Sequence, residues 1–295
     1  MSIYTRSKPR KLLFICLLFL LIASTGCKQQ PSRPPISSDE MTKLVTEFSS
    51  ILDEQANAYN NHDLEGIRDT HTQDVTFYDS GEIYYGVGEI TDTATWIFDN
   101  FPQFSAKFVD IFVSKQDVIA QWEFWNFYIS NQNPVPNWTW LKSKEGKISY
   151  ERTFYTPELY KETGWFGTID TALLDEYVDA WSSGDTQAVA NLYNPEAVRQ
   201  DALFGEDLQG SEAVKNYASD FFTGYPGVKL ESLSTFGAPG KITTLGGIYA
   251  IHTTDGNGKP CDVKTAIVIE TKENKVNNEW VFYNPDSLID CDWAK

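Results

Sequence analysis

Apolar residues at helical spacing mark the start of each half of the sequence. They recur every three or four positions over residues 41–59 and again over residues 169–181, as on the buried face of an amphipathic helix. Ser37 and Glu40 precede the first stretch at the spacing of a capping box. We therefore expect a long helix at the start of each half, with Ser37 capping the first one.

A common order of shorter elements follows both helices. Each half continues with a short helix, a short strand and a third helix, at 64–70, 75–79 and 89–100 in the first half and at 186–193, 197–201 and 212–222 in the second. The remaining runs are strand-like and cover residues 107–114, 118–128, 137–141 and 148–155, then 229–234, 244–253, 264–271 and 279–283. This order predicts an α+β fold, in which a curved antiparallel sheet has its helices packed on one face.

The two halves are also similar in sequence. Three segments recur in the same order: AYNNHD at residue 58 and AWSSGD at 180, FDNFP at 98 and FTGYP at 222, FYTPE at 154 and FYNPD at 282. The offsets of 122, 124 and 128 residues rise in one direction, as small loop insertions would make them. The pattern predicts the duplication of a whole domain, with a first domain over residues 38–160 and a second over residues 165–295.

The first 26 residues have the pattern of an export signal. Four basic residues precede an apolar run at 12–23 that is too short to span a bilayer. Gly26-Cys27 resembles a lipoprotein cleavage site, so we expect a lipoprotein signal peptide over 1–26, lipidation of Cys27 and a flexible tether over 27–37. The alternative is an ordinary secretory signal with a free Cys27. Both interpretations place the domains outside the cytoplasm, and the first anchors them to a membrane of the bacterial cell envelope.

Charge and cysteines narrow the function further. A formal net charge of −17 argues against nucleic acid as a partner and against an anionic membrane surface, because both require a basic patch. Cys261 and Cys291 remain as a pair once Cys16 and Cys27 are assigned to the N-terminal segment. In an oxidising compartment we expect a disulfide between them, and the alternative is two separate buried thiols.

The repeats carry the segments AYNNHDLEGIRDTHTQDVTFYDS with GVGEI, and AWSSGDTQAVANLYNPEAVRQDA with GSEAV. These segments resemble the SnoaL-like branch of the NTF2-like superfamily. The resemblance covers both halves and implies two tandem cone-shaped domains, each a curved antiparallel sheet wrapped by about three helices with a pocket at its open end. It also implies pairing through the sheets, here within one chain as an intramolecular pseudo-dimer. The fold hosts isomerases, cyclases, dehydratases and binding domains, so it does not fix an activity.

The steroid-isomerase members of that superfamily suggest catalytic positions. In them an Asp that ends the first strand moves a proton, and a Tyr late in the first helix donates to the developing oxyanion. The resemblance places these roles on Asp79 in the first repeat and on Asp201 and Tyr177 in the second. Gln55 stands at the Tyr position of the first repeat, and the second, protonated acid of those enzymes has no clear counterpart in either repeat.

Each of these residues also has a structural interpretation. Asp79 would be a general base if its strand face lines an apolar pocket, or else it starts a turn. Asp201 lies two residues from Arg199. The arginine would lower the pKa of Asp201, or the two residues together would hold a polar ligand, or they would form an ion pair on the surface. Tyr177 lies on the buried stripe of its helix, either as an oxyanion donor or as a core residue.

Aromatic residues supply most of the ligand-binding candidates. Rings lie on both faces of several predicted strands, which indicates either a pocket for a flat or apolar molecule or a structural core. The candidates are Tyr59, Phe77, Trp122, Phe124, Trp181 and Arg199. The three His residues are not at metal-ligand spacing and no nucleotide-binding loop is found in the sequence, so we expect neither a metal nor a cofactor.

Two functions fit these expectations. The first is a membrane-anchored lipoprotein that binds a small hydrophobic or polar-aromatic ligand or acts as an interaction scaffold. The second is a cofactor-independent isomerase, cyclase or dehydratase that uses a pocket Asp as general base. A buried Asp at the floor of an open pocket would favour chemistry, whereas a filled cone or an Asp held by Arg199 would favour binding or structure.

Overall fold

The computed structural model describes residues 36–79, 81–128, 134–163, 169–205, 207–238, 243–254, 258–291 and 293. The expected signal peptide, Cys27 and the tether up to residue 35 lie outside the described residues. Ile36, at the end of the expected tether, is buried, and its backbone N–H donates to the carbonyl of Ala202 at 3.1 Å. Within the described ranges, no helix is both long and apolar enough to cross a membrane.

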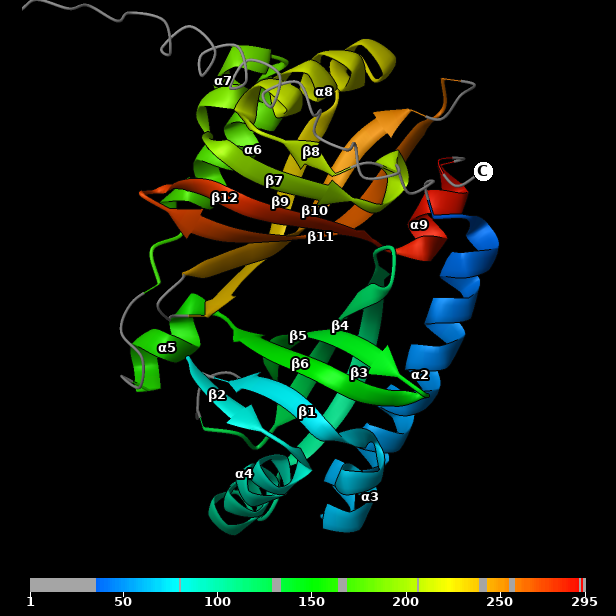
Figure 1. Cartoon of the computed structure of the whole chain (residues 1–295), viewed down its shortest axis with the longest axis vertical. Coiled ribbons are helices and arrows are strands. Elements are labelled where there is room, and N and C mark those ends of the chain that lie inside the picture. The colour runs from blue at the N-terminus through cyan, green and yellow to red at the C-terminus, as the bar shows by residue number, and fades with distance from the viewer. Residues whose placement is uncertain are drawn as a thin grey trace, which may run out of the picture. The chain divides into compact units, whose positions relative to one another are not determined.

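The first repeat is an α+β unit (Figure 1). It comprises α2 (Ser38–Asn60), α3 (Leu64–Asp69), β1 (His71–Asp79), β2 (Glu82–Tyr85), α4 (Val87–Asn100), β3 (Ser105–Val113), β4 (Asp117–Trp125), β5 (Val135–Lys144), β6 (Lys147–Tyr155) and α5 (Pro157–Thr163). Ser37 and Glu40 exchange side-chain and backbone hydrogen bonds at the start of α2, which confirms the capping box. Strands β3 to β6 pair antiparallel in chain order, while β1 pairs parallel with β6 and antiparallel with β2.

The second repeat has the same order of α-helices and strands, with one additional 3-10 helix after its first strand. They are α6 (Ala172–Ser183), α7 (Thr186–Asn191), β7 (Tyr193–Asp201), the short 3-10 helix η1 (Ala202–Phe204), β8 (Leu208–Gln209), α8 (Ser211–Gly224), β9 (Lys229–Ala238), β10 (Thr244–Thr254), β11 (Pro260–Lys272), β12 (Lys275–Tyr283) and α9 (Pro285–Asp290). As in the first repeat, its first strand, β7, pairs parallel with the last, β12, and antiparallel with β8. Cys261 and Cys291 form a disulfide that ties the end of α9 to β11.

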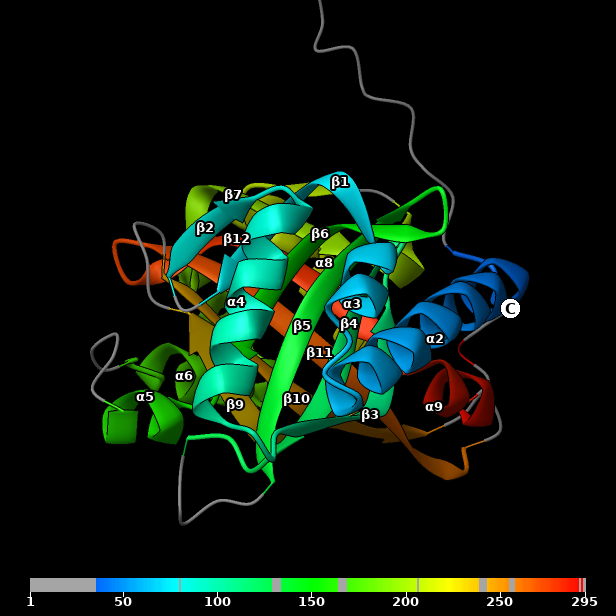
Figure 2. The same ribbon diagram turned by 90° about the horizontal axis from the view of Figure 1, so that it is seen from below.

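Helices cover one face of the curved sheet in the first repeat. Figure 2 shows α2, α3 and α4 across the face of the strands β3 to β6. The buried residues of these helices belong to the same apolar core as the inward residues of the strands. The expected α+β fold with a curved sheet and its helices is confirmed.

One glycine is required before the third helix of each repeat. Gly86 and Gly210 precede α4 and α8 with φ angles of +82° and +85°, which side chains with a Cβ rarely adopt. A Cβ on Gly210 would also lie 2.8 Å from the carbonyl oxygen of Pro195. This accounts for the glycine that begins the GVGEI and GSEAV segments.

The outer faces of the two sheets pack against each other. They form an apolar cluster of Phe112, Ile119, Trp138, Trp140 and Phe154 from the first repeat with Phe236, Ala238, Ile248, Ala266, Val268 and Phe282 from the second. Strand pairing joins the sheets where Tyr155 meets Gly237 and where Tyr283 meets Val113. These two pairs occupy equivalent positions by the repeat offsets, so the contact has the symmetry of the duplication.

Candidate functional site

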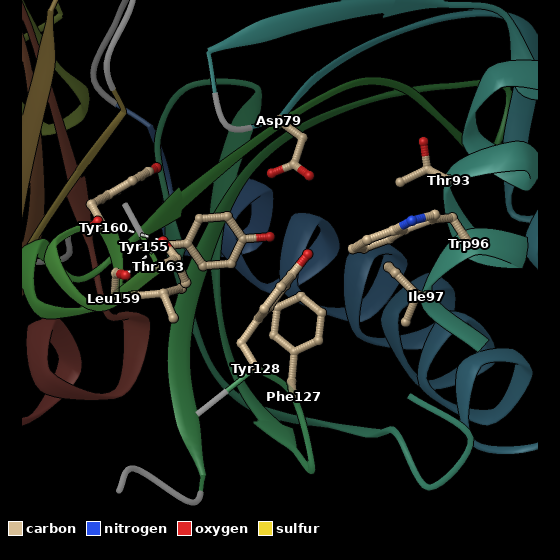
Figure 3. Close-up of a pocket in the computed structure, with 10 residues that line it drawn as sticks. All are labelled: Asp79, Thr93, Trp96, Ile97, Phe127, Tyr128, Tyr155, Leu159, Tyr160 and Thr163. Carbon is tan, nitrogen blue, oxygen red and sulfur yellow. Dashed lines mark hydrogen bonds between the residues drawn. The ribbon is translucent and has the colours of Figure 1, made fainter. Parts of the chain in front are cut away.

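Two adjoining cavities lie in the first repeat. They share Asp79, Thr93, Ile97 and Tyr155. The outer cavity is also lined by Trp96, Phe127, Tyr128, Leu159, Tyr160 and Thr163 (Figure 3). The inner cavity is also lined by Gln55, Tyr59, Phe77, Ile90, Phe104, Trp122, Phe124, Thr139, Glu151 and Thr153. Each has a cavity volume of about 30 Å³.

Asp79 is the carboxylate common to both cavities. It ends β1 on the strand face that carries the buried residues Val75 and Phe77, so the alternation of the strand turns it inward. Figure 3 shows the hydroxyls of Tyr155 and Tyr128 directed toward the Asp79 carboxylate. Burial and the charge of Asp79 raise the pKa of Tyr155 well above its usual value, so this phenol remains a neutral hydrogen-bond donor.

A second carboxylate, Glu151, lines the inner cavity. Its Oε2 lies 2.9 Å from Nε2 of His71, a fully buried ring. The other ring nitrogen lies 2.8 Å from the carbonyl oxygen of Ile67, which is an acceptor and therefore fixes a proton on Nδ1. Glu151 is therefore paired with the His71 ring at the back of the inner cavity.

Gln55 adds an unsatisfied polar group to the inner cavity. Its side chain is 2% exposed and lines the cavity. Among the described residues, its Oε1 has no hydrogen-bond partner. Such buried acceptors are uncommon in folded proteins and are usually explained by a bound water, ion or ligand.

The corresponding interior of the second repeat is filled by an arginine. Arg199 donates to Asp201 Oδ2 at 3.0 Å and forms a short ion pair with Glu279. Its guanidinium carbon lies 4.8 Å from the ring centroid of Trp181 and 5.2 Å from that of Tyr217. Arg199, Asp201 and Glu279 are all at most 5% exposed, so this cation is enclosed by acids and rings.

Both acids of the second repeat are held in place. The Tyr177 hydroxyl donates to Glu279 Oε1 at 2.6 Å, and the Tyr283 hydroxyl donates to Asp201 Oδ1 at 3.0 Å. The expectation of a surface pair is wrong, because Asp201 is 1% exposed. The expected lowering of its pKa is also wrong, because burial raises the pKa of Asp201 and outweighs the attraction of Arg199.

The predicted ligand-binding residues separate by repeat. Tyr59, Phe77, Trp122 and Phe124 line the inner cavity of the first repeat. Trp181 and Arg199 instead contact each other inside the second repeat, together with the predicted catalytic residues Asp201 and Tyr177. The structure therefore brings Asp79 together with four predicted ring residues, and it places the other candidates in a closed interior.

The repeat offsets pair the residues around the two interiors. Gln55, Tyr59, Phe77, Asp79, Thr93, Glu151 and Tyr155 correspond to Tyr177, Trp181, Arg199, Asp201, Tyr217, Glu279 and Tyr283. Glu151 and Glu279 are absent from the sequence-based candidates, although each stands three residues before the Phe-Tyr pair of the third matched segment. Extending that segment backward would have found both acids. Within the described ranges, no cluster of three or more metal-ligating side chains occurs.

Family models match both repeats. A SnoaL-like domain model matches residues 52–151, and a SnoaL-like polyketide cyclase model matches residues 171–288. No curated protein matches the chain. The two matched ranges lie within the two repeats identified from the internal similarity.

Several solved structures are similar to part of the chain. A hypothetical protein with a ketosteroid isomerase-like fold from Catenulispora acidiphila, in complex with trimethylamine, is 16% identical and aligns over 42% of this chain and 93% of its own, with a TM-score of 0.37. A putative polyketide cyclase from Sinorhizobium meliloti is 16% identical over 35% and 93%, with a TM-score of 0.32. A putative isomerase from Bacillus subtilis is 15% identical over 42% and 92%, with a TM-score of 0.37.

Proposed function

We propose, on the premise that the two halves of the chain are SnoaL-like domains, that the first repeat binds a small molecule and that the second is structural. The contrast between the two interiors carries this proposal. Equivalent positions line an open cavity around Asp79 in the first repeat and enclose Arg199 in the second. A cavity with an aromatic lining and a few convergent polar groups is the usual form of a small-molecule site.

Native mass spectrometry of gently purified full-length protein tests this function. We expect a co-purified small molecule, or one retained from a pool of hydrophobic metabolites. The variant Thr93→Tyr should lose it, because it places the residue of the second repeat, Tyr217, at a position that lines both cavities. The variant Tyr217→Phe is the matched control and should retain the molecule. A bare wild-type mass under both conditions would reject a small-molecule function.

A second candidate is proton-transfer catalysis in the same cavity, and the position of the Tyr155 hydroxyl beside the Asp79 carboxylate favours it. In such a reaction Asp79 would take a proton from the carbon next to a carbonyl group, Tyr155 would donate to the enolate oxygen, and the proton would return to another carbon. The test is deuterium incorporation into a panel of small ketones, followed by NMR. Exchange that is catalysed by the wild type and equally by Asp79→Asn would exclude Asp79 as the base.

The N-terminal segment supports a proposal about where the protein acts. We propose that the protein is an exported lipoprotein held to the membrane at Cys27, and that its two domains form a pseudo-dimer within one chain. The apolar run at 12–23 and the Gly26-Cys27 pair support the first part, and the apolar contact between the two sheets supports the second. Incorporation of a labelled fatty acid into wild type and equally into Cys27→Ser would contradict the anchor.

A further inference from the structure

The second repeat contains a cation at the place where the first repeat has its inner cavity. The Arg199 guanidinium is surrounded by Tyr177, Trp181, Asp201, Tyr217 and Glu279. The five equivalent residues of the first repeat are Gln55, Tyr59, Asp79, Thr93 and Glu151, and all five line the inner cavity. Phe77 stands at the position of the arginine. The residues that surround the cation in the second repeat therefore have counterparts around the cavity of the first repeat, but the first repeat has no arginine at its centre.

The charge of the cavity favours a positive ligand. Its lining includes Asp79 and Glu151 but neither lysine nor arginine. Glu151 is already paired with His71, so Asp79 is the carboxylate with which a ligand charge would pair. Burial raises the pKa of Tyr59, Tyr128 and Tyr160, and the charge of Asp79 adds to each rise, after that of Glu151 in the case of Tyr59; these groups therefore stay neutral. The Asp79 carboxylate would repel an anionic ligand.

The inner cavity also contains a buried acceptor that a hydrogen-bond donor of a ligand would satisfy. In the second repeat the Tyr177 hydroxyl accepts from Arg199 Nη1 at 3.2 Å. At the same position in the first repeat, the buried Gln55 Oε1 has no partner within the described residues. An N–H group of a ligand would satisfy it, as the guanidinium does for Tyr177.

The outer cavity defines the rest of the ligand. Phe127 and Leu159 line it with buried apolar side chains, and Trp96, which is 42% exposed, stands beside them. The outer and inner cavities meet at Asp79, so a ligand with its charged group at Asp79 would extend an apolar or aromatic body between these side chains.

We propose that the cavity of the first repeat binds a small organic cation that carries N–H donors, namely an amidinium, a guanidinium or a protonated amine with an apolar body. The proposal rests on the proposed small-molecule function and specifies the class of ligand. Asp79 supplies the counter-charge, Gln55 accepts a hydrogen bond, and the ring of Tyr59 stands where Trp181 stacks on the guanidinium in the second repeat.

Isothermal titration of the full-length protein with three isosteric probes tests the charge. Benzamidine, benzamide and benzoate have almost the same shape and carry a positive, a zero and a negative charge. We expect benzamidine to bind at least about tenfold more tightly than benzamide, and benzoate not to bind. Asp79→Asn should lower the affinity for benzamidine by about tenfold or more and should leave the affinity for benzamide unchanged.

A designed self-inhibition provides a second test. Phe77→Arg gives the first repeat the arginine of the second, a side chain that the fold already accommodates at the equivalent strand position. We expect this variant to fold and to lose benzamidine binding, because its own guanidinium occupies the site. Gln73→Arg adds the same charge on the exposed face of β1 and should bind benzamidine like the wild type.

Several outcomes would overturn the assignment. The first is that benzamide or benzoate binds as tightly as benzamidine. The second is that Asp79→Asn or Phe77→Arg leaves the affinity for benzamidine unchanged. The third is that neither benzamidine nor methylguanidine binds in the millimolar range. If native mass spectrometry still finds a neutral or acidic molecule that Thr93→Tyr loses, then only the ligand class is wrong. If it finds nothing, then the proposed function fails as well.

Discussion

At the scale of single residues, the partners of one buried glutamate distinguish the two repeats. In the first, His71 lies behind Glu151 and Phe77 occupies the inner strand position. In the second, Tyr193 replaces His71 and donates to Glu279 at 2.5 Å, while Arg199 replaces Phe77 and brings its charge into the interior. Both exchanges keep the buried glutamate paired. The exchange at the Phe77 position places a buried cation in the second interior and an aromatic ring in the first.

Removal of the arginine should destabilise the protein strongly. Arg199→Met leaves Asp201 and Glu279 buried without their guanidinium, so we expect the free energy of unfolding to fall by about 3–5 kcal/mol. Chemical denaturation followed by tryptophan fluorescence measures this loss. Arg68→Met is the control, because that side chain is 45% exposed and its pair with Glu65 is long at 4.0 Å; it should cost less than about 1 kcal/mol. Equal effects of the two variants would contradict a stabilising role for the buried pair.

At the scale of elements, an aspartate at the equivalent position precedes the second helix of each repeat. Asp63 accepts from the backbone N–H groups of Glu65 and Gly66 at 3.1 and 3.0 Å, and Asp185 accepts from those of Gln187 and Ala188 at 2.8 and 3.2 Å. The conserved geometry explains why the AYNNHD and AWSSGD segments both end in Asp. This residue is therefore a helix cap in both repeats.

The loss of either cap should have the same modest effect. We expect Asp63→Ala and Asp185→Ala each to lower the free energy of unfolding by about 1 kcal/mol, because two helix N–H groups lose their acceptor. Urea denaturation of the single variants measures the effect. Asp92→Ala, at an exposed position inside α4, should be neutral or slightly stabilising. A loss at Asp92 as large as at the caps would refute the capping explanation.

Features set by nearby residues could be predicted from the sequence, whereas those set by distant pairing could not. The helix α2 and its capping box follow from local spacing and agree with the structure. The sequence predicts strand β1 from residue 75, but the strand begins at His71, because His71 pairs with Ile148 of the distant strand β6. For the same reason, the sequence does not predict that Glu151 lines the cavity. The inward face of Asp79 was predictable, since it needs only the alternation of one strand.

At the scale of the whole molecule, the two repeats pack against each other as one folded unit between residues 36 and 293. The apolar cluster between the sheets holds the side chains of both, and Trp138 stacks on Phe236 with 4.9 Å between ring centroids. Further contacts join the halves at their edges: Asn284 donates to Asp110 at 2.9 Å, and Lys115 donates to the carbonyl of Gly205 at 2.8 Å. The repeats should therefore unfold together rather than one after the other.

A substitution at this contact should therefore affect both repeats. Trp138→Ala removes a large side chain that is 1% exposed, so we expect it to lower the free energy of unfolding by about 3–5 kcal/mol. Amide hydrogen exchange followed by mass spectrometry should show faster exchange in β9 and β10 of the second repeat as well as in β4 and β5 of the first. Trp125→Ala, which removes a ring that is 37% exposed, should leave exchange in the second repeat unchanged. Faster exchange confined to the first repeat in Trp138→Ala would mean that the domains are stable independently, and that the contact between their sheets does not couple them.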